Sequence, residues 1–170
     1  MRLSELNGLD LQNFTARLGT VFEHSPWIAE AAAARRPFAS ADALHAAMMD
    51  AVRAAAPAAQ LALIRAHPEL AGREAGAGAL TADSTSEQAR LGFNALSREE
   101  FERMAGINRR YREKFGFPCI VALKLHRTRG TVIAEMERRI GGARAAEIAA
   151  ALEQIGHIAR GRLERLVQED

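Results

Sequence analysis

The sequence has 170 residues, 48% of them hydrophobic, with a formal charge of +2 and one cysteine. This length suits a single globular domain, and the lone Cys119 excludes an intrachain disulfide bond. No apolar run approaches the ~20 residues that cross a bilayer, so we expect no membrane-spanning helix. The first residues lack the apolar stretch of a secretory signal, and we therefore expect a cytoplasmic protein.

In the first third of the chain, capping residues mark where helices begin. Asp10, Ser25 with Pro26, and Ser40 are residue types that favour the first positions of a helix. These signals predict helices from Leu11 to about Val21, from Trp27 to before Pro37, after Ser40, and from Pro57 to His67. The buried face of the first helix is predicted from residues at helical spacing: Leu11, Phe14, Leu18 and Phe22.

The rest of the chain is also helical in pattern, apart from two segments. Residues Ala71 to Asp83 contain three glycines, which predicts one long loop. Ser84 or Thr85 is expected to cap the next helix, with Glu87 and Gln88 in its first turn, and Ser97 with Glu100 forms a capping box for the helix that Gly116 ends. After the irregular apolar segment Phe117 to Leu123, further helices are predicted from Thr131 to Ile140 and from about Ala143 to Val167. The chain therefore predicts an all-α, single-domain bundle of about eight helices over residues 1–170.

His67 stands out because it lies where a helix must stop. The following Pro68 disfavours helical backbone at His67, and the glycine-rich residues 72–78 come soon after. A histidine in this position can face a pocket and exchange protons near neutral pH. The alternative is that His67 merely caps the end of its helix.

Three further features could carry chemistry. Glu87 would sit near a helix start, where unpaired N–H groups favour an anion, or it would simply cap that helix. The irregular segment Phe117 to Leu123 could line a pocket with free backbone groups, or it could be a buried connector. Arg162, beside the apolar stripe of the last helix, could bind a substrate carboxylate or direct its charge to solvent.

Two other functions compete with this interpretation. The run Arg109 to Lys114 is basic enough to touch phosphates, as in a helical interaction or nucleic-acid-binding protein, although such a run is commonly an exposed helix surface. His67-Pro68-Glu69, with Pro118-Cys119 far downstream, is similar to a zinc deaminase signature. Ala122 stands where that signature needs a second thiolate, so we expect no metal site.

Several stretches taken together resemble the OHCU decarboxylase family, which acts on 2-oxo-4-hydroxy-4-carboxy-5-ureidoimidazoline (OHCU). The matching residues are Phe22-Glu23-His24-Ser25-Pro26-Trp27, Ala66-His67-Pro68-Glu69-Leu70-Ala71, Ser84 with Glu87-Gln88, Tyr111 with Lys114-Phe115-Gly116-Phe117-Pro118, and Ile158-Ala159 with Arg162-Leu163. They follow the family's order over nearly the whole chain. Cys119 departs from the usual aromatic or aliphatic residue and could alter the shape of a pocket.

The resemblance implies an all-α enzyme, often a homodimer, that needs no metal or organic cofactor and converts OHCU to (S)-allantoin with loss of carbon dioxide. It implies that His67 is the catalytic acid or base, that Glu87 is its partner or a substrate ligand, and that Arg162 binds a substrate anion. The other substrate-binding residues that it implies are Pro68, Ser84, Thr85, Ser86, Gln88, Cys119, Ile120, Val121, Ala122 and Leu123. We therefore expect His67, Glu87 and Arg162 to converge on one cavity.

The expected chemistry agrees with these residue types. Loss of carbon dioxide leaves electrons on a carbon next to a carbonyl and a C=N bond, which can delocalise them without a cofactor. A histidine can deliver the proton, and an arginine can recognise a carboxylate with two donors. A non-catalytic relative that binds a ureide is an open alternative function. Functional coupling to hydroxyisourate hydrolase and urate oxidase is a separate open question about partners.

Overall fold

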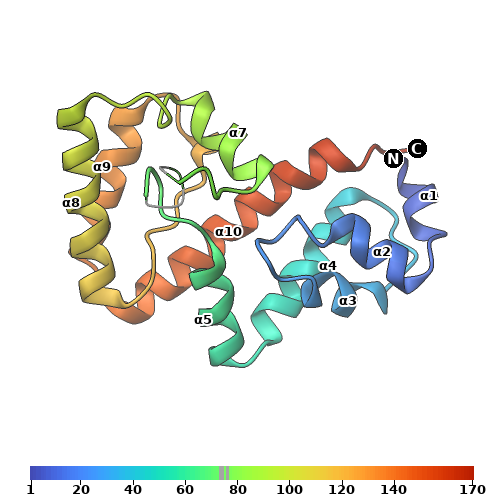
Figure 1. Cartoon of the computed structure of the whole chain (residues 1–170). Helices are drawn as coiled ribbons and strands as arrows, with labels where there is room; N and C mark the ends of the chain where they lie inside the picture. Colours follow the sequence, from blue (N-terminus) through green and yellow to red (C-terminus); the bar gives the residue numbers. More distant parts are fainter. Residues whose placement is uncertain (73–74, 76) are drawn as a thin grey trace. The chain divides into compact units, whose positions relative to one another are not determined.

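The computed structural model describes residues 1–72, 75 and 77–170, and helices dominate this part of the chain (Figure 1). The helices are α1 (Leu3–Asn7), α2 (Leu11–Leu18), α3 (Trp27–Ala33), α4 (Ala41–Ala54), α5 (Pro57–Ala66), α7 (Ala82–Arg90), α8 (Arg98–Phe115), the 3-10 helix η1 (Leu123–Leu125), α9 (Arg129–Ile140) and α10 (Arg144–Leu166). The described residues form no strand, only an isolated bridge between Arg2 and Gln168. The predicted all-α fold is confirmed. Among the described helices, none is both long and apolar enough to cross a membrane.

Contacts along the chain divide it into two compact units. Unit 1 comprises Met1–Ala66 and Gly156–Asp170, and unit 2 comprises His67–Ile155. Helix α10 supplies residues to both units, because its range crosses the boundary after Ile155. The expectation of a single domain over residues 1–170 stays a prediction.

In unit 1, α3 packs against both α2 and α4. The two chain ends also meet in this unit (Figure 1). The amide of Gln168 donates to the carbonyl of Met1, and the amide of Leu3 donates to the carbonyl of Gln168, each at 2.9 Å. The core is built from fully buried apolar side chains, among them Leu6, Phe14, Leu18, Phe22, Ile28, Leu44, Met48 and Leu163.

Most predicted helix starts in unit 1 are confirmed, but four details differ. Helix α2 ends at Leu18 rather than Val21, because Gly19, a poor helix former, follows it. Leu11, at the first position of α2, is 54% exposed, whereas the residues of the predicted face farther along the helix are buried. Ser25 does not cap α3, since its hydroxyl donates to the carbonyl of Glu23 instead. The short helix α1 was not predicted.

In unit 2, the long helix α8 (yellow) lies beside α9 (orange), as Figure 1 shows. Lys114 Nζ near the end of α8 donates to the carbonyl of Ile140 at 2.6 Å, which ties the ends of the two helices together. The predicted capping box of Ser97 and Glu100 is present. Gly116 ends α8 with a φ of 80°, a left-handed conformation that glycine adopts without steric cost.

The start of α9 differs from the prediction. The helix begins at Arg129, two positions before Thr131, because the Thr128 hydroxyl accepts from the amide of Thr131 and so caps an earlier turn. The core of unit 2 includes Met104, Ile107, Tyr111, Phe117, Val132, Met136 and Ile155. On α8, Phe101 lies outside this core and is 50% exposed.

Candidate active site

His67 directly follows the last residue of α5, so the predicted helix stop is one residue late. Its side chain is buried, with 6% exposure, and the next residue, Pro68, is half-buried. A histidine that only capped a helix at the surface would be exposed. The burial of His67 therefore argues against a histidine that only caps an exposed helix end.

Side chains from two helices hold the loop that begins at His67. Asn108 on α8 is buried, and its Nδ2 donates to the carbonyl of Leu70 at 2.9 Å. The Oε1 atom of Gln88 on α7 accepts from the amide of Ala71 at 3.1 Å. Arg112 on α8 forms an ion pair with Glu69. Because three consecutive loop residues are each held by a side chain, the backbone after His67 has a defined conformation.

Ala71 adopts an unusual backbone conformation within this loop. Its φ is +50°, a left-handed region that costs a non-glycine residue about 1 kcal/mol or more. The Gln88 contact to its amide compensates part of that cost. Strain of this kind persists only where the surroundings impose it, and it is frequent at functional sites.

Helix α7 corrects the prediction for Glu87. The N-cap is Thr81, whose hydroxyl accepts from the amide of Ser84, and not Ser84 or Thr85. The first turn therefore holds Asp83, and Glu87 lies in the second turn. Threonine is a favoured N-cap residue, and Asp83 in the first turn is stabilised by the positive end of the helix dipole, so the helix starts earlier. The argument that Glu87 sits among unpaired helix-start N–H groups is wrong.

The predicted site residues of α7 divide into two faces. Ser84 and Gln88 are buried and Glu87 is half-buried, as residues three and four positions apart on one helix face should be. Thr85 and Ser86 are exposed. Glu87 therefore shares the inward face with Gln88, which contacts the His67 loop. The substrate-binding roles of these residues stay predictions.

The segment Cys119 to Leu123 is wholly buried, as the apolar composition suggested, and it is irregular up to Ala122, after which Leu123 begins η1. Arg139 Nη1 donates to the carbonyl of Ile120 at 2.5 Å, and Gln154 Oε1 accepts from the amide of Ala122 at 2.9 Å. Arg90 on α7 donates to the carbonyl of Leu123. Three helices thus hold this segment through its backbone groups.

Cys119 is the buried thiol at the start of this segment. Burial raises the pKa of the thiol from 9.0 to about 12, and the nearby positive charge of Arg139 opposes this only in part. A thiol that stays protonated at neutral pH is neither a nucleophile nor a ready metal ligand. No group of three or more histidine, cysteine or acidic side chains that could hold a metal ion occurs among the described residues.

Arg162 belongs to unit 1, and its side chain is 2% exposed, so the solvent-directed alternative is wrong. Its Nη2 contacts Glu23 Oε1 at 2.9 Å, and Glu23 is itself buried. The structure describes the two units separately. The expected convergence of Arg162 with His67 and Glu87, and its role as a substrate ligand, therefore stay predictions.

The basic run on α8 is partly engaged within the protein. Arg112 pairs with Glu69, and Lys114 donates to the carbonyl of Ile140, while Arg109 and Arg110 are exposed. The carboxylate of Glu69 offsets one positive charge of the run, and the contact to Ile140 holds the ammonium group of Lys114 against the end of α9. The structure therefore weakens the nucleic-acid-binding alternative.

Comparison with known proteins places this arrangement in a family. The family model described as OHCU decarboxylase matches residues 7–164, which run through both units. The chain belongs to the OHCU decarboxylase family. This result confirms the resemblance drawn from the short motifs, and the match includes the His67 loop, α7 and the segment Cys119 to Leu123.

Individual members of the OHCU decarboxylase family align over most of the chain. A protein of Haloferax volcanii named 2-oxo-4-hydroxy-4-carboxy-5-ureidoimidazoline decarboxylase is 40% identical over 96% of this chain and 94% of its own length. The uric acid degradation bifunctional protein PucL of Bacillus subtilis is 38% identical over 98% of this chain, which covers 33% of that protein. A crystal structure of (S)-allantoin synthase superposes with a TM-score of 0.76 at 28% identity, covering 98% of this chain and 54% of that one.

Sequence reasoning missed the residues that hold the site in place. Asn108 was inside a predicted helix with no cue to a polar role, and Arg139 lay in an Arg-Arg pair among other charges. One signal could have found Arg139. Arg139 lies three residues after Met136, which itself lies four after Val132, and this helical spacing puts all three on the buried face of α9.

Proposed function

We propose that this protein decarboxylates OHCU to (S)-allantoin in urate degradation, as a carboxy-lyase that uses neither a metal nor an organic cofactor. The observation that carries the proposal is the family match over residues 7–164, which includes the buried His67 and the loop that follows it. The relative from Haloferax volcanii bears the name of this activity over nearly the same length.

In this reaction the bond between the ring carbon and its carboxylate breaks. The electron pair stays on the ring carbon, where the neighbouring carbonyl and C=N groups delocalise it, carbon dioxide leaves, and a proton replaces it. We propose that His67 delivers this proton and that Glu87 is its partner or a substrate ligand. Proton transfer by a positioned side chain contributes about 10²–10⁴-fold in rate, and delivery to one face gives one enantiomer.

The backbone of Ile120 to Leu123 supports binding of an anionic substrate. Among the described residues, no hydrogen bond is made by the amides of Val121 and Leu123, although both residues are buried. A buried N–H group without a partner is costly, and a ligand oxygen would satisfy it. We propose that these amides donate to oxygens of the substrate. Pro68, Ser84 to Gln88 and Arg162 are its other proposed ligands.

We also propose that the protein acts as a homodimer in the cytoplasm, in functional coupling with urate oxidase and hydroxyisourate hydrolase. The Bacillus subtilis relative, named a uric acid degradation bifunctional protein, is about three times as long as the part that this chain matches. Such a relative supports coupling between successive steps. Mass measurement in solution tests the dimer.

The direct test generates OHCU from urate with purified urate oxidase and hydroxyisourate hydrolase, then adds this protein. We expect the circular dichroism signal of one-handed allantoin to appear much faster than in its absence. A protein that is stabilised by (S)-allantoin but does not accelerate this signal would be a non-catalytic ureide-binding relative.

The site is tested by His67→Asn, with His157→Asn as a matched control outside the proposed site. We expect His67→Asn to lose nearly all activity while its far-ultraviolet circular dichroism stays helical. His157→Asn should keep the activity of the unmodified protein. Near-normal turnover by His67→Asn would overturn the role of His67.

A further inference from the structure

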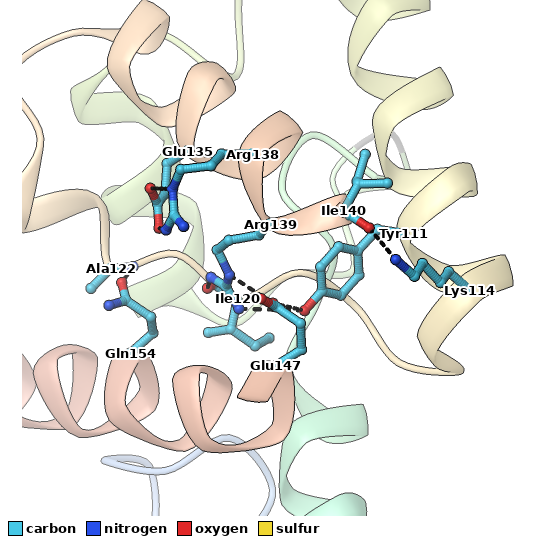
Figure 2. A network of polar contacts seen from close by, with 10 residues as sticks. All are labelled: Tyr111, Lys114, Ile120, Ala122, Glu135, Arg138, Arg139, Ile140, Glu147 and Gln154. Atoms are coloured by element: carbon cyan, nitrogen blue, oxygen red, sulfur yellow. Dashed lines mark hydrogen bonds and ion pairs between the residues drawn. The ribbon is translucent and has the colours of Figure 1, made fainter. Parts of the chain in front are cut away.

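A buried network of charged and polar side chains joins three elements of unit 2 (Figure 2). Arg139 of α9 donates from Nε to Glu147 Oε2 of α10 at 2.8 Å. Tyr111 of α8 donates its hydroxyl to the same carboxylate oxygen at 2.5 Å, and Arg139 Nη2 lies 3.4 Å from that hydroxyl. The exposures of Arg139, Glu147 and Tyr111 are 2%, 5% and 0%.

Stability alone does not explain this network. Removing two charges from water costs several kcal/mol per ion, and well-packed apolar residues of similar volume are often as stable or more so. Burial also raises the pKa of Tyr111, so its hydroxyl stays protonated and serves as a donor. A fully satisfied buried network instead fixes the positions of the groups that it contacts.

The network ends on the backbone of the segment that is proposed to bind substrate. Arg139 Nη1 donates to the carbonyl oxygen of Ile120 at 2.5 Å (Figure 2). Two residues later, the amide of Ala122 donates to Gln154 Oε1 at 2.9 Å, and both residues are drawn in Figure 2. These contacts fix the peptide groups on both sides of Val121.

Because the peptide bond is planar, the contact between Arg139 and the carbonyl of Ile120 also sets the direction of the next N–H group. The carbonyl of Ile120 and the N–H of Val121 belong to one planar trans peptide group, so they point in opposite directions. When Arg139 holds the oxygen, the Val121 N–H must point away from the network. A charged donor on the oxygen also polarises the peptide group and strengthens its N–H as a donor.

We propose that Arg139 is a positioning residue that aims the amide of Val121 at an oxygen of the bound substrate. Glu147 and Tyr111 hold the guanidinium in the orientation that this requires. The inference rests on the proposed function, because it assigns a role within the same substrate site. It goes beyond that function because it assigns a role to Arg139, Glu147 and Tyr111, which act through the backbone of Ile120 and Val121 and not by contact with the substrate.

The test compares Arg139→Lys with its neighbour variant Arg138→Lys. Lysine at 139 keeps a positive charge beside Glu147 but lacks the planar fork that reaches both Glu147 and Ile120. Arg138 is 71% exposed and pairs with Glu135, so Arg138→Lys is a surface control with the same chemical change. Both variants are assayed with freshly generated OHCU, alongside thermal unfolding.

We expect Arg139→Lys to raise KM about tenfold, the size of one lost charge-assisted hydrogen bond, while Arg138→Lys leaves KM unchanged. A variant that is only less stable has fewer active molecules, which lowers the apparent kcat and leaves KM unaltered. Folded Arg139→Lys with the KM of the unmodified protein would overturn the inference. If the unmodified protein itself shows no decarboxylation, the proposed function fails instead.

A measurement on the unmodified protein keeps the inference testable if Arg139→Lys does not fold. Amide resonances of ¹⁵N-labelled protein are followed during titration with (S)-allantoin. We expect the Val121 amide to shift downfield in step with binding, as an N–H does when it gains an acceptor. Saturation of binding with no change at Val121 would contradict the proposed orientation.

Discussion

Among the described residues, unit 1 holds the buried pair of Arg162 and Glu23, and unit 2 holds the buried pair of Arg139 and Glu147; the two pairs differ in the lengths of their contacts to backbone carbonyls. In unit 1, Arg162 contacts Glu23 at 2.9 Å, but its contacts to the carbonyls of Thr20 and Val21 are long, at 3.4 and 3.5 Å. In unit 2, Arg139 contacts Glu147 at 2.8 Å and the carbonyl of Ile120 at 2.5 Å.

The comparison shows that two equally buried ion pairs can contact the backbone at different distances. Both arginine side chains are 2% exposed, and both carboxylates are buried. The unit 2 pair has a phenol on its carboxylate and a contact of 2.5 Å to a carbonyl, whereas the contacts from Arg162 to the carbonyls of Thr20 and Val21 measure 3.4 and 3.5 Å. The pair in unit 2 can therefore orient the peptide group between Ile120 and Val121.

The largest effect is expected from breaking either pair. Glu23→Leu and Glu147→Leu each leave a buried guanidinium without its carboxylate, which should lower the free energy of unfolding by about 3–5 kcal/mol. Urea denaturation measures this loss. Replacing both partners, as in Glu23→Leu with Arg162→Met, should recover most of it. If the single variants unfold like the unmodified protein, the pairs are not as desolvated as their burial indicates.

The next largest effect is expected from Tyr111→Phe, which alters the ion pair of unit 2 and leaves that of unit 1 intact. Tyr111→Phe removes one donor from Glu147 and keeps the ring, so it should lower the free energy of unfolding by about 1.5–3 kcal/mol, as for hydrogen bonds to charged groups. Tyr111 is the only tyrosine in the sequence, so the variant removes no other phenol. Denaturant melts measure the change. An unaltered midpoint would show that Arg139 alone satisfies Glu147.

The free energy of unfolding should depend on pH in the alkaline range through Cys119, the only cysteine in the sequence, which lies in unit 2. Burial raises the pKa of Cys119 from 9.0 to about 12. Below pH 9 the thiol is protonated in the folded and unfolded chains, and above it the unfolded chain ionises first. The free energy of unfolding should therefore fall with rising pH, by up to about 1.4 kcal/mol per pH unit.

Cys119→Ala isolates this contribution. The slope of unfolding free energy against pH, measured by urea melts from pH 8.5 to 10.5, should be shallower in the variant. Below pH 8.5 the two proteins should differ by a constant amount, since the thiol is then neutral in both states. Equal slopes above pH 9 would mean that the thiol is accessible to solvent.

The smallest effect sets the scale for the buried pairs. Arg98 and Glu102, one turn apart on α8, form an exposed ion pair with side chains that are 92% and 65% accessible. Arg98→Ala should change the free energy of unfolding by only about 0.3–0.5 kcal/mol, and less at high salt. A larger loss would mean that charge pairs at this surface matter more than their exposure suggests.

Most helix boundaries follow from local capping signals. Asp10, Ser40, Ser97 with Glu100 and Gly116 act through groups within four residues of themselves, so their effects can be inferred without the fold. Where two capping residues compete, as Thr81 and Ser84 do, the choice depends on small differences in local free energy. The prediction failed there, and with it the placement of Glu87 at a helix start.

The sequence by itself determined the all-α class, the family and the position of His67 at the end of a helix, because periodicity, caps and motifs are local properties. Only the tertiary structure revealed that Asn108 and Gln88 hold the loop after His67, and that Arg139 holds the carbonyl of Ile120. These contacts join residues 17 to 38 positions apart. Which polar side chain meets which backbone group is decided by how the helices pack, and no local pattern encodes it.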